Sequence, residues 1–161
     1  MKKFYRYPVK DYLDALAARE PVPGGGSAAA AAAALGAALI SMVARYSLKK
    51  GKPQAVEKKL TAHLKKSEVI RKKLTELIHL DAESYLDVVR SRKGTAAQKR
   101  KAKTRAQKVP ADIAGQCYKA LELTPFLVKE GNPHLLSDIE VAVELLYAAF
   151  ESALINVRVN Q

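Results

Sequence analysis

The apolar positions of this chain recur at the three- and four-residue spacing of α-helices from Val9 almost to the last residue. Residues 9–19 form a short amphipathic pattern, which ends where two prolines and three glycines follow at 21–26. Ser27, directly after these glycines, is predicted to be the N-cap of the next helix. The strict alternation that marks a β-hairpin occurs nowhere. The pattern therefore predicts an all-α protein.

The run from Ala28 to about Ser47 is almost wholly apolar and mostly alanine. About twenty such residues could cross a membrane. However, alanine contributes little to insertion, Ser41 and Arg45 interrupt the run, and no second span accompanies it. A helix that is apolar on all sides and has small side chains suits the centre of a helical bundle. We therefore predict a buried central helix and no membrane association.

Pro53 is predicted to open a long helix that continues to about Arg92. Its apolar side chains form a narrow stripe close to heptad spacing, which is typical of a bundle or a coiled coil and favours pairing of helices across the subunits of a dimer. The stripe consists of Val56, Leu60, Leu64, Ile70, Leu74, Leu77, Ile78, Ala82, Tyr85, Leu86 and Val89.

Three further helices are predicted after Gly94. The first is short and very basic, at 95–108, and the second covers 111–129 with a kink at Pro125. Ser137 and Glu140 have the spacing of a capping box, which predicts the start of the last helix. The whole chain, residues 1–161, is thus predicted to be one elongated multi-helix bundle.

The 161 residues suit one domain. A single cysteine, Cys117, excludes an internal disulfide and fits a reducing, cytoplasmic compartment; no signal peptide is recognisable. The net charge of +12 is concentrated between Lys49 and Lys108, where 19 basic residues face 6 acidic ones. Such a segment attracts nucleic acid, an anionic membrane surface or a multiply charged small molecule, or it is simply a solvated helix face.

Two features near the central helix point to chemistry. Gly24, Gly25, Gly26 and Ser27 could bind an anion, because glycines let a ligand approach the backbone and a helix N-terminus carries free N–H groups; a tight turn capped by serine is the alternative. Asp81 falls on the apolar stripe, where burial would raise its pKa and make it a usable proton carrier, unless it is a structural partner of a basic group or a helix end.

Two polar groups occupy the last quarter of the chain. Asn156 and Asn160, one turn apart, could bind a heterocyclic ligand or join helices, whereas Asn132, Ser137 and Asp138 form a polar cluster at a helix entrance. No metal site is expected, because the three histidines (His63, His79 and His134) are scattered. His79 is predicted to be exposed, because it lies two residues from Asp81 and hence on another face.

Four blocks in this order resemble the cyclodeaminase/cyclohydrolase family over nearly the whole chain. The blocks are Pro23-Gly24-Gly25-Gly26-Ser27 before an alanine-rich helix ending in Met42-Val43; Asp81-Ala82-Glu83; Gly131-Asn132 leading to Ser137-Asp138 and Val141-Ala142; and Asn156-Val157-Arg158-Val159-Asn160. The family includes the cyclodeaminase domain of formiminotransferase-cyclodeaminase and the stand-alone methenyltetrahydrofolate cyclohydrolases. Each block alone is weak, but four in order are specific.

The resemblance implies a dimeric, all-helical enzyme that acts on one-carbon derivatives of tetrahydrofolate without a cofactor. The family's catalytic aspartate matches Asp81, the general acid/base, and its glycine-rich motif matches residues 24–27. Asn156 and Asn160 would hydrogen-bond the pterin, with Asp138 as a further polar contact, and the basic segment would meet the glutamate tail of a polyglutamylated substrate. Cyclodeaminase and cyclohydrolase activity would use the same residues. A helical homologue that lacks catalysis and binds nucleic acid through 49–108, or a purely structural dimer, remain alternatives.

Overall fold

The computed structural model describes residues 3–48 and 52–160, which form helices and no strand, so the all-α prediction is confirmed. The α-helices of this part of the chain are α1 (Val9–Ala17), α2 (Gly25–Ser47), α3 (Gln54–Ser91), α4 (Ala96–Leu121), α5 (Thr124–Glu130) and α6 (Leu136–Val159). Two short 3-10 helices, η1 (Phe4–Arg6) and η2 (Pro133–Leu135), precede α1 and α6.

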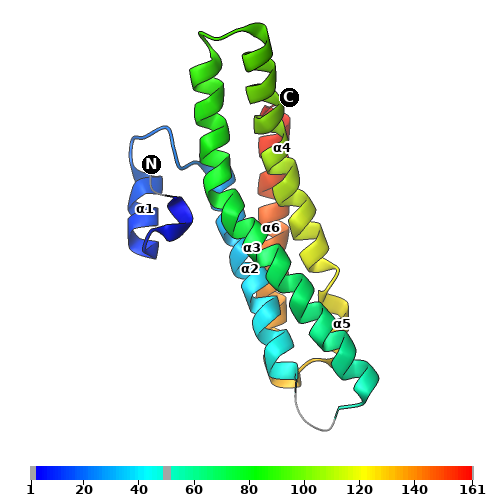
Figure 1. Cartoon of the computed structure of the whole chain (residues 1–161). Helices are drawn as coiled ribbons and strands as arrows, with labels where there is room; N and C mark the ends of the chain where they lie inside the picture. The colour runs from blue at the N-terminus through cyan, green and yellow to red at the C-terminus, as the bar shows by residue number, and fades with distance from the viewer. Residues whose placement is uncertain (1–2, 49–51, 161) are drawn as a thin grey trace.

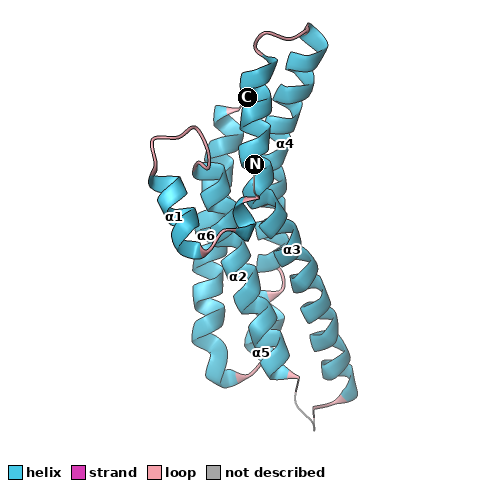
Figure 2. Cartoon of the chain, turned by 60° about the vertical axis from the view of Figure 1, so that its left-hand side comes forward, coloured by secondary structure: helices cyan, strands magenta, loops and turns pink. Residues whose placement is uncertain are grey.

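The four long helices α2, α3, α4 and α6 make an elongated bundle (Figure 1). The helix α2 packs between α3 and α6, and α4 closes the bundle against the same two helices. Fully buried side chains from all four helices fill the centre; the largest include Ile40, Leu60, Leu74, Leu77, Ile113 and Leu146. The hairpin of α3 and α4 extends past the C-terminal end of α6, and α1 stands beside the bundle (Figures 1 and 2).

The alanine-rich helix α2 lies at the centre of the bundle, as its sequence predicts. It is the one helix among the described residues with the length and apolarity of a membrane span, yet 56% of its most apolar stretch is buried against the rest of the protein. One stripe of α2 is not covered, because Leu35 and Tyr46 are each 61% exposed. The helix is therefore a core element with one open apolar side.

The helix boundaries after Gly94 differ from the prediction. The helix α4 runs unbroken through the buried Pro110, where the sequence predicts a break between a helix at 95–108 and another at 111–129. Pro125 opens α5 instead of kinking a longer helix. Proline lacks the N–H that would bond the carbonyl four residues earlier. Here the Asn160 side-chain amide donates to that carbonyl, on Ala106, over 2.9 Å. A side chain from beyond the last turn of α6 thus completes the backbone that Pro110 leaves open.

Both predicted serine caps are wrong. Gly24 is the N-cap of α2 and Leu135 that of α6, so that Ser27 and Ser137 lie inside the first turns of their helices. The 3-10 helix η2 leads directly into α6 and starts that helix before Ser137. The capping box of the structure is at Thr95, whose hydroxyl accepts from the Gln98 N–H while the Gln98 side chain accepts from the Thr95 N–H.

The apolar stripe of α3 is buried only as far as its partner helix reaches. Because α2 begins at Gly25, beside Asp81, the last turns of α3 contact α4 and solvent, and Tyr85 and Val89 are 47% and 37% exposed. The prediction that His79 is exposed is also wrong. Its ring is 5% exposed, because η1 covers that face of α3 with Phe4 and Tyr5.

Candidate functional site

The carboxylate of Asp81 on α3 lies directly against the backbone of Gly26 in the first turn of α2. A Cβ atom at Gly26 would lie 2.1 Å from Asp81 Oδ1, which is much closer than two such atoms can approach. The neighbouring Ser27 N–H donates a hydrogen bond to the same carboxylate. Glycine is therefore required at position 26, because the Cβ atom of any other residue would occupy the space of the Asp81 carboxylate. We call this contact the glycine corner.

The environment of Asp81 favours its neutral form. The side chain is largely buried, and loss of hydration raises its pKa above the ordinary value, while the hydrogen bond from Ser27 opposes the rise. The N-terminus of α2 also places a partial positive charge near the carboxylate. Burial is the larger of the opposing effects. A carboxyl group so placed can exchange a proton closer to neutral pH than a solvated aspartate can.

Sequence reasoning missed Tyr12, which links α1 to the glycine corner. Its hydroxyl is hydrogen-bonded to the fully buried Ser27 hydroxyl at 3.0 Å. Burial raises the pKa of Tyr12, and the charge of Asp81 adds to that rise against the effect of the Ser27 hydrogen bond. In the sequence, Tyr12 is an aromatic residue on the apolar side of a short amphipathic helix. That position indicates packing, and a packing tyrosine cannot be told from a site tyrosine by the pattern alone.

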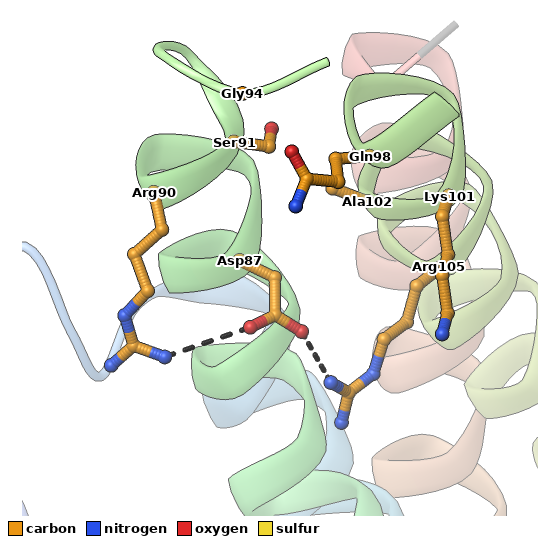
Figure 3. A pocket seen from close by; sticks show the side chains of 8 residues that line it. All are labelled: Asp87, Arg90, Ser91, Gly94, Gln98, Lys101, Ala102 and Arg105. Carbon is orange, nitrogen blue, oxygen red and sulfur yellow. Dashed lines mark hydrogen bonds and ion pairs between the residues drawn. The ribbon is translucent and has the colours of Figure 1, made fainter. Parts of the chain in front are cut away.

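A row of polar and charged side chains runs along α3 toward the hairpin end. His79 Nε2 lies 3.3 Å from Glu83 Oε1, and Arg105 of α4 donates to Glu83 at 2.9 Å and also to Asp87. Arg90 pairs with Asp87 from the other side at 3.6 Å. Figure 3 shows Asp87 held between the two arginines. These three residues line a depression of about 400 Å³, together with Gln98 and Lys101 among others.

The two predicted asparagines near the C-terminus have different surroundings. Asn156 lines an open groove of about 480 Å³ together with Gly25, Ala28, Ala29 and Ala32 of α2; Gly25 precedes the glycine corner in sequence, but Asp81 and Gly26 do not line this groove. Its amide donates to the Ser152 carbonyl. Asn160 instead holds α4: its amide donates to Ala106, and its own carbonyl accepts from the Gln107 side chain at 2.9 Å. Each side-chain amide thus donates one hydrogen bond within the protein, but Asn156 also faces the groove, whereas Asn160 joins the end of α6 to α4.

The remaining predicted residues lie at the opposite end of the bundle. The Asn132 N–H donates to the hydroxyl of Ser47, the last residue of α2, and the Asn132 side chain accepts from the His134 N–H. Ser137 and Asp138 follow in the first turn of α6. Since α2 has 23 residues, about 33 Å separates them from the glycine corner. Within one chain, the predicted site residues thus fall into two groups, one at each end of α2.

Metal ligands do not gather in the part of the chain that the structure describes: no three His, Cys, Asp or Glu residues lie close enough to hold an ion. Cys117 is fully buried, and burial raises the pKa of its thiol to about 12. A thiol in that state is a poor nucleophile. Among the described residues, Asp81 is the candidate for proton transfer.

The sequence and the fold of the chain both match known proteins. The sequence model of the formiminotransferase-cyclodeaminase family matches residues 8–161. A methenyltetrahydrofolate cyclohydrolase of Methylorubrum extorquens is 36% identical over 162 residues, which cover 94% of this chain and 78% of that protein. The crystal structure of formiminotetrahydrofolate cyclodeaminase from Thermotoga maritima matches with a TM-score of 0.90 and 30% identity, over 96% of this chain and 78% of that one.

Proposed function

Because the chain belongs to the formiminotransferase-cyclodeaminase family, we propose that it opens the bridged one-carbon ring of 5,10-methenyltetrahydrofolate with water to give 10-formyltetrahydrofolate. The observation that carries this proposal is the buried carboxyl group of Asp81 at the glycine corner. The 36% identity to a cyclohydrolase favours ring opening over ring closure. Neither reaction requires a cofactor, and we expect the enzyme to work in the cytoplasm.

Asp81 would act as general base and then as general acid. Its carboxylate takes one proton from the water that attacks the bridging carbon, and the substrate loses its positive charge. When the bond from this carbon to N5 breaks, the same proton passes from Asp81 to N5. The second proton of the water leaves to solvent as the formyl carbonyl forms. A raised pKa suits both steps, because the group must accept and release a proton near neutral pH.

Cyclodeaminase activity is the second candidate, favoured by the structural match to the Thermotoga maritima cyclodeaminase. In this reaction N10 of 5-formiminotetrahydrofolate attacks the formimino carbon, and ammonia leaves as the methenyl ring closes. Asp81 would then protonate the departing nitrogen. Asn156, which lines a groove together with Gly25, would hydrogen-bond the pterin in either reaction. Any polyglutamyl tail would be expected to reach the arginines of the depression in Figure 3.

One spectrophotometric assay separates the two reactions. The purified protein is expected to accelerate the loss of near-ultraviolet absorbance of methenyltetrahydrofolate. With 5-formiminotetrahydrofolate as substrate, a cyclodeaminase would instead produce that absorbance and release ammonia, measured with a coupled assay. If neither substrate is converted faster than in buffer, the proposed function is wrong.

A homodimer would bring the two groups of site residues together. The open stripe of α2 is apolar along its length, with Leu35 at its middle, and α1 beside it exposes Val9 and Leu13. A twofold axis across the middle of α2 would place the glycine corner of one subunit beside the C-terminal end of α2 in the other. Asp138 and Asn156 are 18 residues, or five full turns, apart on the same face of α6. In such a dimer Asp138 of the partner subunit would approach the groove that Asn156 lines.

We expect Leu35→Glu to convert the protein to monomers, because two buried carboxylates would face each other at the centre of the interface. Light scattering after size-exclusion chromatography measures the mass of the particle, and the absorbance assay measures turnover. Turnover should fall when the mass falls to that of a monomer. Tyr118→Glu is the matched control, since Tyr118 on α4 is similarly exposed at 58%. A wild-type protein that elutes as an active monomer would contradict the dimer.

A further inference from the structure

The end of the α3–α4 hairpin, residues 88–108, carries nine basic residues and no acidic one. We call this segment the hairpin tip. Its basic residues are Arg90, Arg92, Lys93, Lys99, Arg100, Lys101, Lys103, Arg105 and Lys108. Arg90 and Arg105 are paired with acids of α3, but the other seven form no ion pair with the described residues. The excess charge of the basic segment is therefore concentrated here and uncompensated.

The rest of the basic segment is different. Residues 49–87 contain ten basic and six acidic residues, so acidic side chains lie among the basic ones. Of the lysines and arginines described at 52–87, Arg71 is the one that forms an ion pair. Glu68 accepts two hydrogen bonds from Arg71 and also pairs with Arg45; the bonds to Arg71 contribute most to lowering the pKa of Glu68 to about 2. We interpret the charged side of residues 54–87, on α3, as an ordinary solvated helix face. The hairpin tip requires a separate explanation.

The charge of the hairpin tip opposes the stability of the helix that carries it. The first turn of α4 has no acidic residue, although the positive end of a helix favours one. Lys99 and Lys103 are four residues apart, as are Lys101 and Arg105, and like charges at that spacing repel. The helix start is held instead by the uncharged capping box of Thr95 and Gln98. A positive potential kept at such a cost is consistent with an anionic partner.

The shape and composition of the hairpin tip narrow the class of partner. The end of the hairpin projects past α6 (Figures 1 and 2). The seven cations without an ion pair are all exposed. Of the large apolar residues in the tip, only Val89 is exposed, at 37%. The tip therefore has little apolar surface to insert into a lipid bilayer, which disfavours a membrane as its partner. Seven unpaired cations on several sides exceed what the few carboxylates of one glutamate tail would neutralise. A long, regularly spaced polyanion fits better.

We propose that the hairpin tip binds the phosphodiester backbone of nucleic acid. Lysines and arginines that contact phosphates bind without regard to sequence, because the backbone is the same for every base. The tip has no aromatic side chain on which bases could stack, so its contacts would be to phosphates alone. Binding of this kind releases counterions and weakens steeply with salt. It is independent of the chemical step at the glycine corner, although the tip includes Arg90 and Arg105, where a polyglutamyl tail is expected.

The test uses the full chain and fluorescently labelled 20-nucleotide RNA and 20-base-pair DNA, with binding followed by anisotropy across a salt series and without folate. Wild type is expected to bind at micromolar concentration or tighter in low salt, with an affinity that falls steeply as salt rises. The triple variant Lys99→Gln, Arg100→Gln, Lys103→Gln should bind at least tenfold more weakly. The matched variant Lys58→Gln, Lys65→Gln, Lys66→Gln removes three cations elsewhere and should change the affinity less than twofold.

Three results would overturn the proposal. One is the absence of micromolar binding to either nucleic acid, and another is an equal loss in the two triple variants. The third is a preference for another polyanion, seen as tighter binding to vesicles containing phosphatidylserine or displacement of the RNA by penta-γ-glutamate at the same concentration of charge. Because no folate is present, failure of this test leaves the enzymatic assay unaffected, and the reverse also holds.

Discussion

Replacing Asp81 with asparagine is expected to lower kcat by about 10²- to 10⁴-fold, the range over which a positioned acid or base accelerates a reaction. Asparagine has nearly the same shape and can still accept the hydrogen bond from the Ser27 N–H, but it cannot carry a proton. The loss should therefore appear in kcat, with little change in KM. Turnover of methenyltetrahydrofolate at saturating substrate measures it. A variant as fast as wild type would exclude Asp81 from proton transfer.

The same substitution should not destabilise the fold, and this separates a catalytic effect from unfolding. The pKa of Asp81 is raised in the folded protein, so the folded state binds more protons than the unfolded state between the ordinary pKa, about 3.9, and the raised value. Stability contributed by this group is therefore present at low pH and is lost as pH rises through that window. An asparagine side chain does not titrate, so at neutral pH Asp81→Asn should melt at an equal or higher temperature than wild type.

The wild-type rate should rise with pH through the raised pKa of Asp81, since ring opening needs the carboxylate to accept a proton from water. In Asp81→Asn this limb of the profile should disappear from the residual activity. A wild-type rate that does not change across the same range would mean that another group takes the proton. Burial of this carboxyl group has two effects: it raises the pKa, which suits proton transfer, and it makes the ionised form costly to the stability of the fold. The pH profile measures the first effect and the thermal melt measures the second.

The sequence was informative where a residue type contradicted its surroundings. Asp81 in an apolar stripe and three glycines before an alanine-rich helix were both unusual, and the structure places Asp81 against Gly26. Contacts between segments far apart in sequence were not readable in this way. His79 is predicted to be exposed because it lies two residues from Asp81, on another face of the helix, but η1, more than seventy residues earlier, buries it.

Pro110 illustrates a second limit. Local rules end a helix before proline, and they hold because the proline leaves a carbonyl unbonded. In this fold the amide of Asn160, fifty residues later, bonds that carbonyl, so α4 continues. The same contact explains why an asparagine that looked like a ligand-binding residue is occupied within the protein. The periodicity of apolar residues predicts which face of a helix is buried. It does not show which polar groups on different helices form hydrogen bonds with each other.

Gly26→Ala is the second substitution for which we expect a large effect. The added Cβ would lie 2.1 Å from Asp81 Oδ1 and 2.5 Å from its Cγ, so the acid and the start of α2 must move apart. Overpacking of this kind typically costs about 1–3 kcal/mol of stability. Moving the carboxyl group by even about 1 Å can lower a rate about 10²-fold. We therefore expect both a lower melting temperature and a loss of turnover of at least that size.

The neighbouring glycine supplies the control, because it tests the motif without the contact. A Cβ at Gly25 would meet no atom within 4 Å, and Gly25 already has a helical conformation, so Gly25→Ala should fold as well as wild type or slightly better. If the corner served only to bring backbone N–H groups to an anionic part of the substrate, the two alanine variants would lose activity to a similar degree. If its function is to seat Asp81, only Gly26→Ala is severely affected. The ratio of kcat between the two variants, measured at temperatures where both are folded, decides which role the glycine motif has.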